Sequence, residues 1–332
     1  MKPERTASTI RPTGDLDRAA QVLRQGGLVA VPTETVYGLA GDARSGEAVA
    51  RIFEVKGRPA FNPLIAHVAT LAMADRLTRL SSEAERLADA FWPGPLTLVL
   101  PMRVDASVHP LVTAGLPSLA IRWPRGAMAE LSCMIDAPLA APSANRSGSV
   151  SPTRAEHVLE SLGDRLDGGR DTVLERGGDA EVGVESTIVS LLDDRPTLLR
   201  PGGLEREAVE QVLGMSLLSP PASAPDGERP AAPGMLASHY APRGTVRLDA
   251  ARVEPHEFLI GFGPVRAAGS PSGSYVLSER ADLREAARRL FDALHAANAA
   301  GAEAIAVEPV PHEGLGEAIN DRLRRAAAPR ER

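Results

Sequence analysis

Short apolar runs that end at proline or glycine recur along the chain, and they restrict it to folds with buried strands. Three examples within residues 96–145 are LTLVLPM, SLAIRWP and LAAPSAN. Between such runs lie longer segments with apolar residues at helical spacing, such as EAVARIFEVKG and TRAEHVLESLG. Hydrophobic residues make up 43% of the chain, which is enough for a sizeable core. The pattern predicts an α/β protein.

The first two thirds of the chain contain most of these elements. Further strands are expected at PLIAHV, STIVSLL, PTLLRPG and LVAVPTETVYGL, the last of which runs into a loop. STIVSLL and PTLLRPG are separated by DDR, which is typical of a hairpin or meander. Further helices are expected at residues 15–27, at LEREAVEQVLG, and at SSEAERLADAFWPG with a serine N-cap.

The composition changes at residues 219–233, where proline, alanine and charged residues replace the apolar pattern, as is typical of a linker. Strand patterns then return at TVRLD, FLIGFG, SYVLS and AIAVEPV, with helix patterns over 282–300 and 315–328. This alternation predicts a small α/β domain with a largely parallel sheet. We therefore divide the chain into an N-terminal tail (1–14), a first domain (15–214), a linker (215–242) and a second domain (243–332).

Charge and cysteine content exclude several classes of protein. A net charge of −6 argues against a protein that coats nucleic acid through bulk positive charge. The single cysteine, Cys133, excludes a disulfide framework and a zinc site built on several thiolates, and we expect it to be a buried small hydrophobe. The N-terminus lacks the apolar segment of a signal peptide, and no apolar run approaches the roughly 20 residues of a membrane span. We expect a cytoplasmic protein with no membrane partner.

Standard nucleotide-binding and hydrolase motifs are missing. The sequence contains no G-x-x-x-x-G-K-[ST], no H-E-x-x-H and no G-x-S-x-G. GFGPVR lacks the third glycine of a dinucleotide fingerprint, so we interpret it as a strand end. A nucleotide would have to bind by another route.

Two cations, Lys56 and Arg58, lie two residues apart in KGRPAFNPL, with Gly57 and Pro59 restricting the turn. Two cations in a rigid turn form a good receptor for phosphate or carboxylate. The alternative is a solvated helix C-terminus, which also favours cations.

A loop rich in hydroxyl groups, APSANRSGSVSPT, follows a predicted strand. Its hydroxyls, amide and exposed N–H groups suit bicarbonate, phosphate or an adenine edge, and a helix begins at its end. The alternative is ordinary helix capping by Ser151 or Thr153.

Polar residues also stand at other strand ends. Thr33, Glu34 and Thr35 follow one strand, GVEST precedes another, and Arg122 and Arg200 end two more. Polar groups at the carboxyl ends of strands line the usual crevice of α/β folds. The alternatives are that the arginines extend to solvent and that Glu34 and Glu185 only brace loops.

Taken together, these segments resemble a known family. VPTETVYGL, KGRPAFNPLIAHV, PGPLTLVL, LAIRWP, APSANRSGSVSPT, GVESTIV and LLRPGG, in this order, are similar to the YrdC-like domain of threonylcarbamoyl-AMP synthases. The resemblance runs from about residue 16 to 214, and ASHYAP with GLGEAINDRLRRAA resembles the long two-domain form of the family. It implies an open twisted α/β sheet around a basic cleft, followed by a smaller Rossmann-like α/β domain.

The resemblance also implies roles for individual residues. The family constellation that holds bicarbonate and phosphate groups corresponds to Lys56, Arg58, Ser143 and Asn145. The positions that hold L-threonine correspond to Thr35, His67, Arg122 and Ser186. The positions that contact ATP correspond to Arg58, Asn62, Thr113, Ser143, Ser151 and Arg200. The linker tyrosine that folds over the nucleotide corresponds to Tyr240, and we expect the second domain to restrain this lid.

The implied reaction joins L-threonine, bicarbonate or CO2, and ATP into threonylcarbamoyl-AMP for transfer to tRNA by a threonylcarbamoyl transferase. All species on this path are anionic, so fixed cations and N–H donors suit it. Mg2+ is expected with ATP, but no carboxylate cluster marks a protein site for a metal.

Two other functions were weighed. A module that only binds structured RNA would need no threonine pocket, and the net negative charge argues against it, although a weak RNA contact stays open. A carbamoyl-transferring maturation enzyme with a related domain would carry zinc-finger cysteines, whereas this chain has one cysteine.

Overall fold

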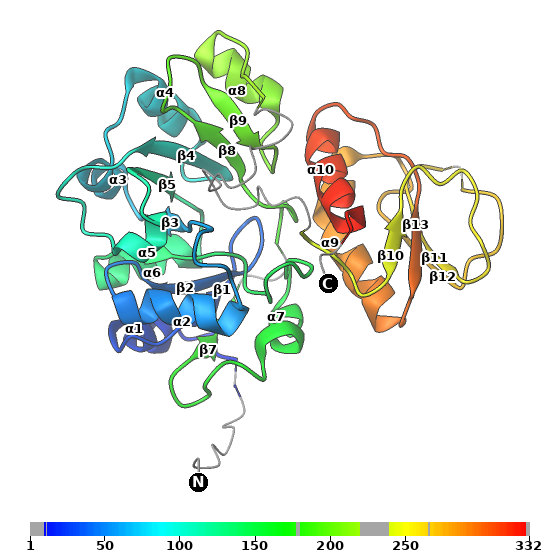
Figure 1. The fold of residues 1–332 in the computed structure, drawn as a ribbon, viewed down its shortest axis with the longest axis horizontal. Coiled ribbons are helices and arrows are strands. Elements are labelled where there is room, and N and C mark those ends of the chain that lie inside the picture. Colours follow the sequence, from blue (N-terminus) through cyan, green and yellow to red (C-terminus); the bar gives the residue numbers. More distant parts are fainter. Residues whose placement is uncertain (1–9, 11, 177–179, 220–238, 265, 330–332) are drawn as a thin grey trace.

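The computed structural model describes residues 10, 12–176, 180–219, 239–264 and 266–329. The described residues form two sheets, and helices α9 (Leu283–Ala299) and α10 (Leu315–Ala327) stand between them (Figure 1). The predicted linker at 219–233 lies almost entirely outside the described residues.

The first sheet is mixed and has the order β7-β1-β2-β6-β3-β5-β4-β8-β9. Its strands, in chain order, are β1 (Val29–Val31), β2 (Gly38–Asp42), β3 (Ile65–His67), β4 (Leu96–Pro101), β5 (Ser118–Arg122), β6 (Leu139–Ala140), β7 (Thr172–Val173), β8 (Thr187–Ser190) and β9 (Thr197–Arg200). The pairs β3–β5 and β4–β8 are parallel, and β8 and β9 form the antiparallel hairpin that the sequence predicted.

Helices flank this sheet, and polar residues at their ends explain where several begin. They are α1 (Leu16–Arg24), α2 (Gly46–Lys56), α3 (Leu71–Leu77), α4 (Ser82–Phe91), α5 (Pro110–Thr113), α6 (Ala127–Ile135), α7 (Ala155–Leu162) and α8 (Arg206–Leu213). Ser45 and Ser81 cap α2 and α4 by accepting hydrogen bonds from the backbone N–H groups of Ala48 and Ala84. The serine cap of α4 was predicted.

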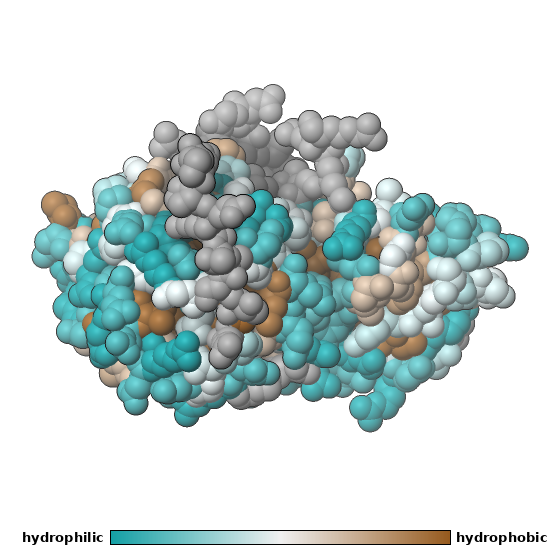
Figure 2. Space-filling view, turned by 90° about the horizontal axis from the view of Figure 1, so that it is seen from below, coloured by the Kyte–Doolittle hydropathy of each residue, from teal (hydrophilic) through white to brown (hydrophobic). Residues whose placement is uncertain are grey.

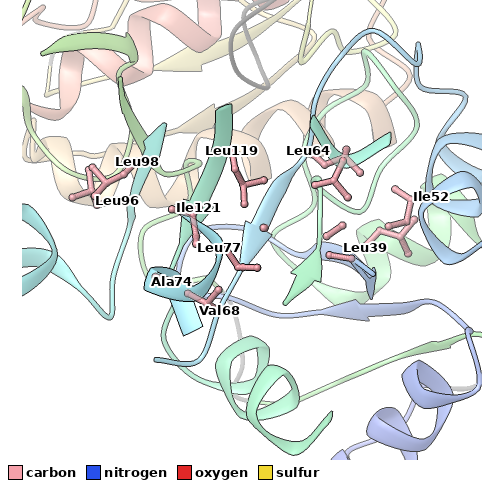
Figure 3. Packing of buried hydrophobic residues seen from close by; sticks show 14 of the residues in the cluster. Leu39, Ile52, Leu64, Val68, Ala74, Leu77, Leu96, Leu98, Leu119 and Ile121 are labelled. Carbon is pink, nitrogen blue, oxygen red and sulfur yellow. The ribbon is translucent and has the colours of Figure 1, made fainter. Parts of the chain in front are cut away.

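The main core lies between the first sheet and its helices. In Figure 3, Ile121 of β5 lies beside Ala74 and Leu77 of α3, and Leu96, Leu98 and Leu119 belong to the same buried cluster. Burial of these apolar side chains stabilises the fold by roughly 1.5–3 kcal/mol for each large residue. The core fixes the strand ends at which the candidate site lies.

The second sheet has the order β10-β13-β11-β12, and all its pairs are parallel, as predicted. Its strands are β10 (Thr245–Arg247), β11 (Glu257–Gly261), β12 (Gly273–Val276) and β13 (Ala304–Val307). Helices α9 and α10 cover the face of this sheet that is turned toward the first domain (Figure 1). The fold class predicted from the sequence is therefore confirmed.

The two domains share one hydrophobic cluster. Val36, Val150 and Val184 of the first domain belong to the same buried cluster as Phe291 of α9 and Ile319 of α10. Because a shared apolar core resists separation, the second domain forms a fixed wall beside the first one.

Two histidines stack across this interface. The rings of His157 in α7 and His295 in α9 have centroids 3.7 Å apart with an interplanar angle of 11°. Around them, Thr153 and Arg154 donate to the Asp292 carboxylate, and His295 Nε2 lies 3.1 Å from the backbone oxygen of Ser151. A stacked pair at this separation excludes a charge on both rings.

We expect the chain to lose stability as the pH falls below about 6.5. Burial, and then the neighbouring His295, lower the pKa of His157 to about 3, and burial also lowers the pKa of His295. Both histidines take up protons at a higher pH in the unfolded chain than in the folded one, so protonation favours unfolding. Their contribution to the free energy of unfolding is therefore complete above about pH 6.5 and declines toward pH 3. The Tm of His157→Gln/His295→Gln should therefore fall less between pH 7.5 and 5 than that of the wild type. His256→Gln, at an exposed position, serves as control, and an unchanged pH dependence in the double variant would contradict this prediction.

Three sequence predictions require correction. LVAVPTETVYGL runs into a second strand, β2, because the chain turns back at 32–37 and pairs antiparallel with β1. LAAPSAN forms only the two-residue strand β6. Cys133 is exposed, not buried, because α6 turns Met128, Leu131 and Ser132 inward and places Cys133 on the other side.

The visible face of the molecule in Figure 2 is mainly hydrophilic, with small separate hydrophobic patches. Among the described residues, no helix is both long and apolar enough to cross a bilayer.

Candidate active site

A cavity of about 50 Å³ lies where strand ends of the first sheet meet the linker. Eight of the residues that line it were predicted as site residues: Thr35, Arg58, His67, Arg122, Ser143, Ser186, Arg200 and Tyr240. They come from segments that are far apart in the sequence, and the sheet order brings these segments together.

Lys56 joins the two loops on which the anion-site prediction depends. It ends α2, is 3% exposed, and donates from Nζ to the carbonyl oxygens of Ser143 and Asn145. Its own carbonyl accepts from the Ser147 N–H at 2.9 Å. Burial, and then the neighbouring Arg58, lower the pKa of Lys56 well below its usual range. A solvated helix end is therefore excluded, and Lys56 holds the shape of the loop at 143–149.

Arg58 is turned toward the cavity by the end of α2. Gly57 adopts φ 62°, a left-handed conformation that glycine takes without steric cost. The Arg58 guanidinium then donates to the backbone oxygens of Asn62 and Pro63 at 3.1 and 2.8 Å. Burial, with a smaller effect of Arg200, lowers the pKa of Arg58 to about 9. Within the described ranges Arg58 has no carboxylate partner, so an incoming anion would stabilise its charge.

Ser143 lines the cavity, and Asn145 supports the loop behind it. The Asn145 amide donates to the backbone oxygens of Arg146 and Ser149. Its Oδ1 is buried and accepts no hydrogen bond from the described residues. A buried acceptor without a donor is costly unless a ligand supplies one.

Arg122 and His67 stand side by side on neighbouring parallel strands, in register between β5 and β3. Arg122 donates from Nη1 to Thr35 Oγ1 at 3.0 Å and from Nε to the Gly94 carbonyl. Burial, and then Arg122, lower the pKa of His67 to about 3, so the imidazole is neutral. Its Nδ1 has no hydrogen-bond partner within the described part of the chain. This wall thus presents one cation, one neutral imidazole and one hydroxyl.

Glu34 is the ionic partner of Arg122, since its Oε1 lies 2.9 Å from Arg122 Nη2 and both side chains are buried. The two atoms are close but lack the alignment of a hydrogen bond. The other Glu34 oxygen accepts from the Arg125 N–H at 3.2 Å. Arg122 is therefore buried and paired, which contradicts the alternative that it extends to solvent.

Ser186 and Arg200 form the wall toward the second domain. Arg200 is buried and donates to the Ser186 carbonyl at 2.8 Å, and the Ser186 hydroxyl lies 2.7 Å from Thr97 Oγ1. The following loop packs so closely that a Cβ at Gly202 would lie 2.3 Å from the Glu185 carbonyl. Only glycine fits there, and the glycine fixes Arg200 over the cavity.

The linker closes the cavity through His239 and Tyr240. Tyr240 is 1% exposed and has φ 62°, which is unusual for a residue other than glycine. The next residue, Ala241, donates to the Gly148 carbonyl, so the linker pairs with the loop that carries Ser143 and Asn145. Burial lowers the pKa of His239 to about 3.

Some predicted site residues do not line the cavity. Thr113 ends α5 and donates to the Pro110 carbonyl, and Asn62 accepts from Arg58 through its backbone oxygen. Ser151 donates to Glu185 Oε1 at 2.6 Å, and Thr153 donates to Asp292, so neither residue caps α7. Lys56 and Asn145 stand behind the wall.

Glu185 and His239 also line the cavity, although neither was predicted as a site residue and bracing of a loop was the alternative for Glu185. GVEST contains Glu185 and ASHYAP contains His239, so both segments were found, but the direction of these side chains depends on contacts made across the domains.

The cavity combines three arginines, Arg58, Arg122 and Arg200, with hydroxyl groups and backbone donors, and the arrangement suits two or more anionic groups. The described residues contain no group of three or more histidine, cysteine, aspartate or glutamate side chains able to hold a metal ion. The residues that line the cavity can instead stabilise negative charge and position a ligand.

Known proteins are similar to this chain over nearly its whole length. Residues 21–202 match the family described as "Telomere recombination", and residues 204–328 match "Threonylcarbamoyl-AMP synthase, C-terminal domain". The threonylcarbamoyl-AMP synthase of Bacillus subtilis is 42% identical over 94% of this chain and 93% of its own length. The synthase of Pyrococcus abyssi is 41% identical over 93% of each chain.

A solved structure shows the same architecture. The crystal structure of P. abyssi Sua5 complexed with L-threonine superposes with a TM-score of 0.84 at 38% identity, covering 94% of each chain. Both domains, and not the first alone, therefore have counterparts in one relative. This chain belongs to the threonylcarbamoyl-AMP synthase family.

Proposed function

We propose that this chain condenses L-threonine, bicarbonate or CO2, and ATP into threonylcarbamoyl-AMP and pyrophosphate, the activated form for modifying adenosine in tRNA. The observation that carries the proposal is a single cavity with Arg122, His67 and Thr35 on one wall and Arg58, Ser143 and Arg200 on the others. The first group suits an amino acid, and the second suits phosphate oxygens.

In the first step the neutral amine of threonine attacks CO2 and gives up a proton, or attacks bicarbonate with release of water, and becomes a carbamate. Arg122 holds the threonine carboxylate, while Thr35, His67 and Ser186 contact the rest of the amino acid. Because the His67 imidazole is neutral, it can accept or donate a hydrogen bond without repelling the ammonium group of the incoming amino acid.

In the second step a carbamate oxygen attacks the α-phosphorus of ATP, and the bond to pyrophosphate breaks. Arg58 and Arg200 stabilise the negative charge that develops on the phosphoryl oxygens. Ser143 and the N–H groups of the loop held by Lys56 orient the carbamate. Further ATP contacts are assigned to Asn62, Thr113 and Ser151.

The cavity volume of about 50 Å³ is far below the few hundred Å³ of a pocket that holds a drug-sized ligand. Tyr240 and His239 must therefore withdraw to admit ATP and return over it, which makes the linker a lid. The second domain restrains this lid, since the His239 N–H donates to the Arg325 carbonyl of α10.

Mg2+ enters with ATP. The carboxylate that lines the cavity, Glu185, is engaged by Arg322, and Glu34 is engaged by Arg122. These residues do not fit a dedicated magnesium site, so the metal would be supplied with ATP and not by this part of the chain.

Pyrophosphate release from ATP tests the proposed function. The complete mixture should release pyrophosphate, and omission of threonine or of bicarbonate should each abolish release. Release that is independent of threonine would contradict the proposal. The product then passes to a tRNA threonylcarbamoyl transferase, and any direct contact with RNA should be weak and lost at high salt.

Arg122→Lys should raise the KM for threonine by about 10- to 100-fold, because a point charge cannot reproduce a bidentate charge-assisted hydrogen bond worth roughly 1.5–3 kcal/mol. Lysine can still pair with Glu34, so the fold should persist. The measurement is pyrophosphate release as a function of threonine concentration at saturating ATP.

Arg125→Lys is the matched control for this variant, because Arg125 is exposed and follows the same strand. It should leave the KM for threonine unchanged. An Arg122→Lys variant with the same KM as the wild type would remove Arg122 from the threonine site.

A further inference from the structure

Arg322 belongs to the second domain, yet its side chain reaches the cavity wall of the first. It lies in α10 and is 0% exposed. Its Nε donates to Glu185 Oε2 at 2.7 Å, and its Nη1 donates to the Pro201 carbonyl at 3.0 Å. Nη1 also donates to Asp321 at 2.6 Å, so the guanidinium is held from its own helix.

Glu185 links Arg322 to the candidate site. One of its oxygens accepts from Arg322, and the other accepts from the Ser151 hydroxyl at 2.6 Å. Glu185 itself lines the cavity beside Ser186 and Arg200. The carboxylate therefore holds the Ser151 hydroxyl, and the chain continues from Glu185 directly into Ser186 of the cavity wall.

The same arginine also contacts the lid and the phosphate wall. Its Cζ lies 5.1 Å from the centroid of the Tyr240 ring, a distance at which a cation attracts an aromatic face. Pro201, whose carbonyl it binds, directly follows Arg200. One side chain thus connects four segments of the site that are otherwise separate in the sequence.

Arg322 also changes the net charge of the cavity wall. ATP, bicarbonate, threonylcarbamoyl-AMP and pyrophosphate are anionic, and an uncompensated Glu185 carboxylate in the wall would repel them. Arg322 compensates that charge from behind the wall, since it does not line the cavity and its Nε and Nη1 donate to Glu185, Pro201 and Asp321. Its Nη2 is buried and has no hydrogen-bond partner among the described residues.

We propose that Arg322 is a positioning residue for the adenylation step, through which the second domain holds Glu185, Ser151 and the Arg200 loop in the reactive arrangement. This inference rests on the proposed function and goes beyond the lid. It assigns the second domain a direct part in shaping the ATP side of the cavity.

The test compares steady-state pyrophosphate release by the full-length chain carrying Arg322→Met, Arg322→Lys, Glu185→Gln, or Arg322→Met with Glu185→Gln. Arg324→Met is the matched control, since Arg324 lies on the exposed face of the same helix. We expect Arg322→Met to lower kcat/KM for ATP by about 10- to 100-fold, and the double variant to be no worse, because two residues of one unit are not additive. Arg322→Lys should retain part of the activity, and Arg324→Met all of it.

A pH profile separates positioning from a merely structural role. Burial raises the pKa of Glu185, but Arg322 and then Arg200 outweigh it and hold the pKa at about 2. Without Arg322 the carboxyl should take up a proton at higher pH and lose its repulsive charge, so the activity of Arg322→Met relative to the wild type should recover as the pH falls. The double variant lacks the carboxyl and should show no such recovery. The other charged or titratable groups around Glu185 are Asp321, His239 and Tyr240.

Two outcomes overturn the inference. If Arg322→Met lowers only Tm and leaves kcat/KM for ATP and the pH profile as in the wild type, Arg322 is a structural link alone. If Arg322→Met does not fold, Arg322→Lys and Glu185→Gln take its place, and wild-type kcat/KM in both overturns the inference equally. A wild-type chain without threonine-dependent pyrophosphate release refutes the proposed function itself, and this is seen before any variant is compared.

Discussion

Arg58→Ala should lower kcat/KM for ATP by about 10²- to 10³-fold, the usual effect of removing one preorganised donor from a site of developing charge. Arg58 is buried at the cavity and is bonded to two backbone carbonyls, without a carboxylate partner among the described residues. Its charge is therefore oriented before any substrate arrives. The measurement is pyrophosphate release under subsaturating ATP, together with thermal unfolding, because the carbonyls of Asn62 and Pro63 lose their donor in this variant.

Arg165→Ala is the matched control for Arg58→Ala. Arg165 is exposed and donates to the Val55 carbonyl at the same end of α2, but from outside the cavity. It should retain full activity. Arg58→Lys should recover part of the loss, since it restores charge without the planar fork. Near-normal kcat/KM in a folded Arg58→Ala variant would remove Arg58 from the site.

Lys56→Met should lower kcat/KM by about 10²-fold and also lower Tm. Methionine has nearly the same length but no donor, so the carbonyls of Ser143 and Asn145 lose their partner at a cost of roughly 1–3 kcal/mol each. The loop would then relax and carry Ser143 away from the phosphate side. Lys56→Arg should also reduce activity, because a larger group in a closely packed position strains its surroundings.

Glu54→Met provides the comparison for Lys56→Met, because Glu54 is an exposed residue on the last turn of the same helix. It should leave both kcat/KM and Tm near wild-type values. If Lys56→Met lowers Tm but retains full activity, the loop does not need Lys56 to shape the site, and the role assigned to it is wrong.

Local patterns were sufficient to predict most elements of the fold. The parallel second sheet followed from alternating strand and helix patterns, and the β8–β9 hairpin followed from two apolar runs separated by three polar residues. β2 was missed, because GLAGD has small residues and no clear alternation, and it becomes a strand only by pairing with β1 and β6.

The resemblance to a known family predicted that the segments containing Lys56 and Asn145 lie close together. It did not predict which residue each side chain contacts. Glu34 pairs with Arg122 across 88 positions of sequence, and only the return of the chain at β5 brings them together. No local pattern encodes such a pair. Cys133 likewise depends on which face of α6 the sheet covers.

The sequence contains a signal for the buried position of Arg322. The buried side of α10 includes Leu315, Ile319 and Leu323, and Arg322 is at a position spaced with this apolar stripe. An arginine on the apolar face of a helix predicts a buried partner, since a desolvated cation without one is strongly unfavourable. The spacing identifies the residue, but only the structure identifies Glu185 as its partner.

A crystal structure of the full-length chain with L-threonine and a non-hydrolysable ATP analogue tests the central claim most directly. We predict the threonine carboxylate within hydrogen-bond distance of Arg122, the phosphates against Arg58 and Arg200, and Tyr240 over the nucleotide. Density for the analogue elsewhere on the molecule, with the cavity between the loops at 56–58 and 143–145 unchanged, would contradict the account.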